Sequence, residues 1–497
     1  MRKLRYAAFA VLAAGALVGV ATMAFATKPA KGEEHGNVPT DTREIVKDIS
    51  ADNIQSSIHT LVGFGTRHTL SSQTDPVRGI GAAAEWVYNR FLEIAATSGG
   101  RMTVEKQSFI QPVGPRIPVP TQITNVIATL HGSQPESANR IYLVSGHLDS
   151  RCTDVLDFTC DAPGAGDDGS GVAAVLEMAR AMATHHFDAT IKFVAFSGEE
   201  QGTFGSLFYA TQAKAAGENV AGMFSNDIIG SSLGQNGERD RRDVRLFADG
   251  PPPNETPAEA AIRRTMGGEN DTPARELARF IRDEAEPAVP TMNVWIIYRR
   301  DRFLRGSDHG PFLDNRYPAV RFTEPNEDFR HEHQNVRVEN GVQFGDLEQF
   351  LDFDYIANVA RVNAAALAAL ANGPAAPQNV KVEASTLSTD TQLEWTANTE
   401  PDLAGYEIVY RDTTEPFLVA RDQGRQRHQL HGQEHHQGQL PLRRPGRRHR
   451  PQPERRHLPG SQVGTTARCG RSPTTVSARS RSHCRSAACD DASGTFG

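Results

Sequence analysis

The sequence predicts an α/β fold with a mostly parallel central sheet, helices on both faces and a partial all-β sandwich module after it. Apolar runs of strand length alternate along most of the chain with longer segments whose apolar residues recur at helical spacing. Strands that alternate with helices pack as a parallel sheet covered on both faces. Beyond Pro374 only short strands and turns remain, which predicts a separate β module.

The predicted elements follow one another in a regular order. The helices are expected at residues 45–61, 80–97, 170–182, 204–216, 274–286 and 353–371. The strands are expected at 102–110, 124–130, 141–144, 191–196, 220–224, 292–298 and 317–322. The last helix ends at Asn372-Gly373-Pro374, a firm stop signal. Residues 233–290 are rich in charge, Pro and Gly, and apart from one helix we expect a surface excursion there.

The N-terminus predicts export. Residues 1–26 combine basic residues, an apolar core and a final Ala-Phe-Ala, as a secretory signal peptide does, and residues 27–40 form a linker. The alternative is an uncleaved membrane anchor, because the apolar run approaches spanning length. We expect a secreted, periplasmic or cell-envelope protein with no stable membrane insertion after cleavage. The main domain spans 41–373. The net charge of −7 excludes no class of partner, but no basic face in this domain indicates nucleic acid, so no nucleic-acid partner is expected.

Residues 375–416 resemble the first half of a fibronectin type III module. The resemblance is carried by Trp395 and the phrase DLAGYEIVYR, within short strands expected at 380–382, 392–395 and 406–410. It ends at about Glu415, so the module is partial.

Residues 417–497 have a composition unlike the rest of the chain. From Arg421 onward there are fifteen Arg and no Lys. Residues 426–448, back-translated and read one base later, give NVTSYTVKNITKDNYLFGVRAV, which would supply the missing strands of the module. We therefore predict a frameshifted, disordered tail; the alternative is a disordered arm that binds nucleic acid or metal.

Two cysteines lie in the loop between His147 and Asp167. In an oxidising compartment Cys152 and Cys160 are expected to form a local disulfide, with two free thiols as the alternative. Closing this small loop would contribute roughly 2–3 kcal/mol on the chain-entropy estimate. It would also stiffen the arm between two candidate ligands.

Candidate metal ligands follow the ends of separate predicted strands. Open α/β sheets place their chemistry at the carboxyl ends of strands, and imidazole with carboxylates is a ligand set typical of zinc. Two zinc ions, about 3.5–4 Å apart, would share one bridging carboxylate. The candidates are His147, Asp167, Glu200, Asp227 and one of His331 or His333.

Six motifs in order resemble the di-zinc exopeptidases typified by the secreted bacterial leucine aminopeptidases. The motifs are SGHLDS, PGAGDDGSG, FSGEEQGTFGS, NDIIG, SDHGPF and HEHQ, within residues 45–372. The resemblance implies the zinc exopeptidase fold for residues 41–373 and a co-catalytic pair of zinc ions.

Roles in the site come from this resemblance. Asp167 would bridge both metals, with Glu200 and His333 completing one site and His147 and Asp227 the other. His333 is preferred over His331 because its His-Gln pair aligns better with the family.

Three further residues complete the implied site. Glu199 would be the general base, and Asp149 would orient His147. Asp168 resembles the family's residue beside the bridge, where the first of the usual three acidic residues is here Gly166.

The oxyanion stabiliser is open from sequence. Relatives often carry a Tyr shortly before the SDH turn, and this chain has none there, so Arg302, Arg305 or a zinc ion would take that role. His309 in this turn is expected to be structural.

The resulting prediction is an exported zinc aminopeptidase that hydrolyses N-terminal residues of peptides. A carboxypeptidase and a glutaminyl cyclase are alternatives on the same fold. A binding or adhesion protein with a vestigial metal site is a further, non-enzymatic alternative.

Overall fold

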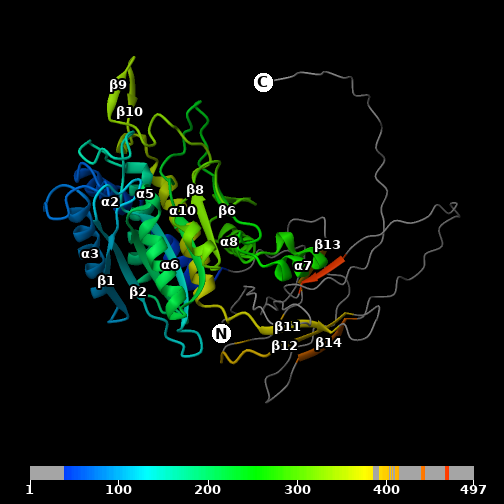
Figure 1. The fold of residues 1–497 in the computed structure, drawn as a ribbon. Helices are drawn as coiled ribbons and strands as arrows, with labels where there is room; N and C mark the ends of the chain where they lie inside the picture. Colours follow the sequence, from blue (N-terminus) through cyan, green and yellow to red (C-terminus); the bar gives the residue numbers. More distant parts are fainter. Residues whose placement is uncertain are drawn as a thin grey trace, which may run out of the picture.

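An eight-stranded mixed sheet organises the protein (Figure 1). The computed structural model describes residues 38–383, 391–401, 403, 406, 409–412, 438–442 and 465–468, so the predicted signal peptide lies outside the described residues. The strand order is β1-β2-β4-β3-β5-β8-β6-β7. The strands are β1 (Met102–Gln111), β2 (Thr121–Leu130), β3 (Arg140–His147), β4 (Thr190–Phe196), β5 (Asn219–Asn226), β6 (Asp243–Ala248), β7 (Asn293–Ile297) and β8 (Ala319–Thr323).

The centre of the sheet is parallel and its flanks are mixed. Strands β4, β3, β5 and β8 are parallel neighbours. At one side β1 and β2 run antiparallel, and β2 is antiparallel to β4. At the other side β6 is antiparallel to β8 and parallel to β7. The predicted α/β class is therefore confirmed, and the parallel arrangement holds where it positions the site.

Helices cover both faces of the sheet. One face carries α3 (Ile80–Ala96), α4 (Ser170–Met182), α8 (Pro273–Ala288) and α10 (Phe353–Ala371), with α1 (Thr40–Asp48) and α2 (Ala51–Gly63) packed on this layer. The other face carries α6 (Phe204–Ala216) and α9 (His309–Asp314). Within the described residues, no helix is long and apolar enough to cross a bilayer.

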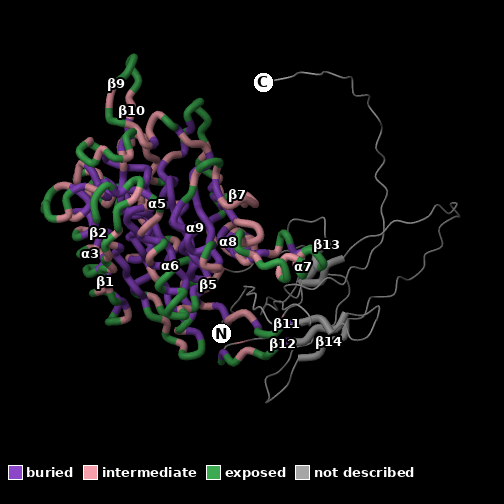
Figure 2. The backbone as a smooth tube through the Cα atoms, in the orientation of Figure 1, coloured by how far each residue is buried: buried purple, intermediate pink, exposed green. Residues whose placement is uncertain are grey.

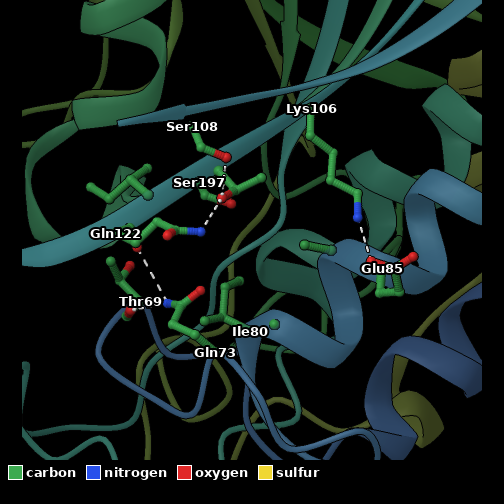
Figure 3. Close-up of a pocket in the computed structure, with 12 residues that line it drawn as sticks. Thr69, Gln73, Ile80, Glu85, Lys106, Ser108, Gln122 and Ser197 are labelled. Carbon is green, nitrogen blue, oxygen red and sulfur yellow. Dashed lines mark hydrogen bonds and ion pairs between the residues drawn. The ribbon is translucent and has the colours of Figure 1, made fainter. Parts of the chain in front are cut away.

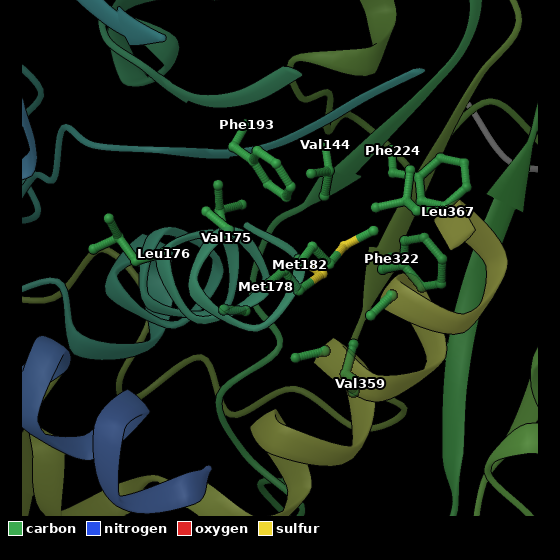
Figure 4. Packing of buried hydrophobic residues seen from close by; sticks show 14 of the residues in the cluster. Val144, Val175, Leu176, Met178, Met182, Phe193, Phe224, Phe322, Val359 and Leu367 are labelled. Atoms are coloured by element: carbon green, nitrogen blue, oxygen red, sulfur yellow. The ribbon is translucent and has the colours of Figure 1, made fainter. Parts of the chain in front are cut away.

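Strand alternation divides the core into two parts. Val144 and Phe193 point toward α4 and α10, where Val175, Met178 and Leu367 complete the larger cluster (Figure 4). Their strand neighbours, such as Leu143 and Val194, belong to a smaller cluster under α6 and α9. Because both faces of the central strands are covered, these strands read as continuous apolar runs. Figure 2 shows this buried interior in purple.

The first predicted helix is two helices. The chain leaves the helical conformation at Ile49, and Ser50 then caps α2 by accepting a hydrogen bond from the Asn53 amide at 3.4 Å. Ile45, Ile54 and Ile58 are all fully buried, so the apolar spacing runs through the break. Periodicity alone could not show the break, whereas the Ser cap is a local signal for it.

The predicted surface excursion at 233–290 is wrong, because this segment builds part of the core. Strand β6 lies in the sheet between β8 and β7, with Val244 and Leu246 fully buried. Helix α8 packs against α10. The segment also contains α7 (Pro257–Met266), which starts with a Thr256–Glu259 capping box. Strand β6 was not predicted because charged residues interrupt its short apolar alternation.

Other elements lie outside this sheet. A hairpin of β9 (Arg337–Glu339) and β10 (Val342–Phe344) projects from the domain in Figure 1. In the predicted fibronectin-like module, β11 (Gln378–Glu383) and β12 (Thr391–Thr396) pair antiparallel.

The predicted tail is described only in two short strands. Strand β14 (Gly438–Leu442) pairs with β12, and β15 (Thr465–Arg468) pairs with β13 (Val409–Asp412). The rest of 417–497 lies outside the described residues, so the frameshift and the module both stay predictions.

Candidate metal centre

The parallel centre of the sheet brings the predicted site residues together. His147 is the last residue of β3, and Asp227 directly follows β5. Glu199 and Glu200 open the short helix α5 (Glu199–Gly202), three residues after β4. Because β3 lies between β4 and β5 and all three are parallel, their carboxyl ends meet at one edge.

Asp167 stands between two pairs of candidate ligands. Its Oδ1 lies 2.9 Å from His147 Nε2, which is 3.8 Å from Asp227 Oδ1. Its Oδ2 lies 2.9 Å from His333 Nε2, which is 3.1 Å from Glu200 Oε2. We call His147 and Asp227 the inner pair, and Glu200 and His333 the outer pair. One carboxylate thus presents one oxygen to each pair.

The structure distinguishes the two histidines that the sequence offered. His333 faces Asp167 and Glu200, from the loop after β8. His331 instead stacks on Phe350, with ring centroids 3.6 Å apart, and lies 3.7 Å from Asp328. His333 is therefore the member of the HEHQ motif that reaches the cluster.

The half-buried Asp346 and the buried Arg67 hold the loop that carries Asp167. The Asp346 carboxylate accepts hydrogen bonds from the amides of Gly166 and Asp167, each at 2.7 Å. On the other side, Arg67 donates to the carbonyls of Leu148 and Gly164 at 2.7 and 2.8 Å. The Asp346 carboxylate thus binds amide N–H groups of the loop and the Arg67 guanidinium binds carbonyl groups. Together these contacts hold the candidate bridging carboxylate in place.

Asp168 supports the same region from its other side. It accepts hydrogen bonds from the His147 amide at 2.8 Å and from the Gly171 amide at 3.0 Å. A Cβ at Gly171 would lie 2.4 Å from both the Asn226 carbonyl oxygen and Asp168 Oδ2. Glycine is required here because helix α4 starts against the end of β5.

Asp149 contacts His147 differently from the prediction. The group within hydrogen-bond distance of His147 Nδ1 is the backbone carbonyl of Asp149, at 3.0 Å, while the carboxylate lies 3.8 Å away. The carboxylate instead accepts from the amides of Glu199 and Glu200, each at 3.1 Å, and from Thr69 Oγ1 at 2.9 Å. Asp149 therefore orients both glutamates through the start of α5.

The inner pair is backed by a buried ion-pair chain. Arg321 Nη2 lies 2.9 Å from Asp227 Oδ1, and its Nη1 lies 2.8 Å from Asp301. Burial alone would raise the pKa of Asp227, but the Arg321 guanidinium and His147 together outweigh it and hold that pKa below its usual value. His309 lies 2.8 Å from the Arg300 carbonyl through Nε2, which fits the structural role expected for it.

The outer pair is flanked by two arginines. Arg151 Nε lies 3.1 Å from Glu200 Oε2, and Arg305 Nη2 lies 2.7 Å from Glu332 Oε1. Arg302, the other arginine considered as oxyanion stabiliser, pairs with Glu327 and Asp301 instead. Only Arg305 of these two sequence candidates reaches the cluster.

The donor set fits metal cations. Among the described residues, His147, Asp167 and Asp227 offer ligand atoms within 4.8 Å of one another, and so do Asp167, Glu332 and His333. The buried Glu200 Oε1 has no hydrogen-bond partner. Imidazole nitrogens with carboxylate oxygens are a ligand set suited to zinc.

Charge at the site favours a cation as well. Burial would lower the pKa of His333, but the carboxylates of Glu200 and Asp167 outweigh it and raise that pKa to about 10. Burial also raises the pKa of Glu199 well above its usual value. A third group of possible ligands contains Cys152 and Cys160, but these form the predicted disulfide, so no thiol is free there.

A polar cavity opens beside the cluster, between α3 and the β1–β2 hairpin (Figure 3). Its lining includes Ser108, Gln122 and the Lys106–Glu85 ion pair, but none of the five predicted ligands. Thr69 lines it and also donates to Asp149, which makes the cavity a neighbour of the cluster.

Sequence reasoning missed several charged residues that surround the ligands. Arg67, Arg321 and Asp346 are single charges in segments without a motif, and a lone charge in a sequence is usually solvated. The available signal for Arg321 is its place inside an apolar strand, where an unpaired charge would be costly. Arg151 follows the SGHLDS motif and Glu332 lies within HEHQ, yet nothing local shows which way their side chains point.

Comparison with known proteins shows the family. The profile of peptidase family M28 matches residues 125–338. A probable zinc metalloprotease of Leptosphaeria maculans is 50% identical over 374 residues, which cover 75% of this chain and 86% of that protein. One of Pyrenophora teres f. teres is 50% identical over 373 residues, covering 75% and 77%.

Solved structures of low sequence identity are also similar. The Legionella pneumophila LapA aminopeptidase is 19% identical with a TM-score of 0.47, covering 69% of this chain and 78% of that one. A Porphyromonas gingivalis glutaminyl cyclase is 19% identical with a TM-score of 0.44, covering 64% and 98%. On the family profile and the two fungal relatives, which confirm the resemblance seen in the motifs, this chain belongs to peptidase family M28.

Proposed function

We propose that this protein is an exported zinc aminopeptidase that removes N-terminal residues from peptides. The observation that carries the proposal is the position of Asp167, whose two oxygens face two separate pairs of ligands. This is the arrangement that a bridging carboxylate between two metal ions needs. The relatives named as probable zinc metalloproteases support zinc as the metal.

The residues would share the work as follows. Asp167 with the inner and outer pairs would hold two zinc ions, which when bound would polarise the peptide carbonyl and favour ionisation of water. The Glu199 carboxylate would take a proton from the attacking water and pass it to the leaving amine as the C–N bond breaks. The Asp149 carboxylate accepts hydrogen bonds from the Glu199 and Glu200 amides, so it would fix the position of the base relative to the neighbouring ligand.

Zinc analysis and a hydrolysis assay on purified protein test this proposal. We expect two zinc ions per chain and release of p-nitroaniline from aminoacyl-p-nitroanilides, lost on dialysis against a chelator and restored by zinc. Cyclisation of N-terminal glutamine without anilide hydrolysis would identify a glutaminyl cyclase instead. Zinc binding without either activity would favour a binding protein.

Export rests on the predicted signal peptide. Residues 1–26 lie outside the described part of the chain, so the disulfide between Cys152 and Cys160 is the supporting observation. N-terminal sequencing of the protein from culture supernatant or periplasm should start near residue 27. A mature protein that keeps Met1 in the cytosol would contradict export.

A further inference from the structure

Two guanidinium groups converge on the outer pair. Arg151, in the loop after β3, places Nη2 2.8 Å from His333 Nδ1. Arg305, in the loop before α9, places Nη1 3.3 Å from the same ring nitrogen. Two cations from distant segments thus meet at one point beside the candidate metal centre.

Their position is at the rim of the site. The Arg151 and Arg305 side chains are 17% and 32% exposed, while their carboxylate partners Glu200 and Glu332 are 4% and 5% exposed. The carboxylates are therefore more buried than the arginine side chains that pair with them. A molecule that enters the site from solvent therefore meets the two arginines and His333 before it meets Glu200.

The contacts of these arginines depend on the ligands. In the described part of the chain, the polar groups that Arg151 contacts are the Glu200 carboxylate and His333 Nδ1. An imidazole that binds a metal through Nε2 carries its proton on Nδ1, so it cannot accept from a guanidinium. When the outer pair holds a metal, Glu200 is shared with that cation as well. Two arginines would then have one carboxylate of their own, Glu332, and an unpaired, partly desolvated charge is costly.

We propose that Arg151 and Arg305 bind the free α-carboxylate of the substrate, so that the preferred substrates are dipeptides. This inference rests on the proposed peptidase function and narrows its substrate class. The planar guanidinium matches a carboxylate in a bidentate fashion. In a dipeptide the carboxylate lies on the leaving residue, next to the bond that breaks. Each added residue would carry it about 3.3–3.6 Å further along an extended chain, away from the arginines.

Leu-Ala and its amide, Leu-Ala-NH2, form the matched substrate pair for the full-length, zinc-loaded protein. We expect kcat/KM to favour Leu-Ala by about 10- to 100-fold, as for hydrogen bonds to a charged group. Arg151→Gln and Arg305→Gln should each reduce this preference, mainly through KM for Leu-Ala. Arg151→Lys keeps the charge but loses the planar group that can bind a carboxylate through two hydrogen bonds, so it should give an intermediate preference.

Arg302→Gln is the matched control. Arg302 lies three residues from Arg305 but pairs with Glu327 and Asp301, so its loss should leave the ratio between the two substrates unchanged. Calorimetry on the Glu199→Gln variant gives a readout without turnover. There Leu-Ala should bind more tightly than its amide, and Arg305→Gln added to this variant should reduce the difference.

Each outcome is decisive. Equal kcat/KM for both substrates in the native protein would overturn the carboxylate site and leave the peptidase proposal standing. Equal losses for both substrates in the arginine variants, through kcat, would mean that the guanidiniums face the oxyanion instead, which also overturns it. If neither substrate is hydrolysed, the proposed function itself fails, whereas binding to the Glu199→Gln variant still tests the arginines separately.

Discussion

The inner and outer pairs have the same chemistry but different supports. His147 ends strand β3 and Asp227 follows β5, and their side chains are 1% and 5% exposed. His333 lies on the loop after β8 with φ of 53°, a strained conformation for a non-glycine residue, and its side chain is 17% exposed. Hydrogen bonds of the sheet hold the inner pair, while side-chain contacts hold the outer one.

The difference in support suggests that the two pairs have different roles, one in metal retention and one in substrate contact. The inner pair lies at the ends of two paired strands and has a buried counter-charge in Arg321. In the outer pair His333 is 17% exposed although Glu200 is buried, and the pair is accompanied by the side chains of Arg151 and Arg305. We therefore expect the inner pair to hold its metal more tightly and the outer pair to meet the substrate.

The largest effect should come from the residue that both pairs share. Asp167→Ala removes the ligand that the two metal sites share, so zinc should fall from two ions per chain toward zero and activity should be lost. Asp227→Ala touches the inner pair alone and should keep about one ion. Metal analysis after dialysis, with circular dichroism as a check on folding, distinguishes them. Two ions retained in Asp167→Ala would remove the bridge.

The next effect separates the base from its neighbouring ligand. Glu199→Gln should keep both zinc ions and lower kcat by about 10²–10⁴-fold, because the amide cannot accept the proton. KM should change little. Glu200→Gln should instead weaken zinc at the outer pair, and added zinc should restore part of its activity. The reverse pattern in kinetics and metal content would exchange the two roles.

A smaller effect is expected from the carboxylate that holds the Asp167 loop. Asp346→Asn leaves one of the two amides, Gly166 or Asp167, without an acceptor. Zinc affinity should fall by about 10- to 100-fold at both pairs together, as for other residues that support ligands. Competition with a chromophoric chelator measures this. Glu348→Gln, whose partner His59 lies on the surface, is the control and should bind zinc normally.

The smallest effect on metal binding should come from the disulfide, and it should fall on the outer pair. Thr153, inside the disulfide loop, exchanges hydrogen bonds with Asn335, next to the HEHQ motif. Replacing Cys152 and Cys160 by Ser should lower the free energy of unfolding by roughly 2–3 kcal/mol on the chain-entropy estimate. Outer-pair zinc should exchange faster while inner-pair zinc does not. Equal changes at both pairs would show that the loop supports the whole site.

The inner pair could be predicted from the sequence pattern more directly than the outer pair. His147 and Asp227 follow apolar runs that read as buried strands, so their meeting at one edge could be predicted from the parallel sheet. His333 has no such neighbour, and its choice over His331 came from a resemblance to a family. Strand β6 was missed because its charged residues, such as Arg245, mask a short alternation whose burial comes from strands distant in sequence.

The sequence by itself predicted the α/β class, the five candidate ligands with the candidate base, and the disulfide, because each leaves a local pattern of period, motif or spacing or a resemblance to a family motif. The tertiary structure alone decided which ligand faces which oxygen of Asp167. It also decided that Asp346 and Arg67 hold that loop, and that Arg151 and Arg305 meet at His333. The physical reason is that a charged side chain in a loop acquires its partner only when the sheet brings distant segments together. No short stretch of sequence records that partner.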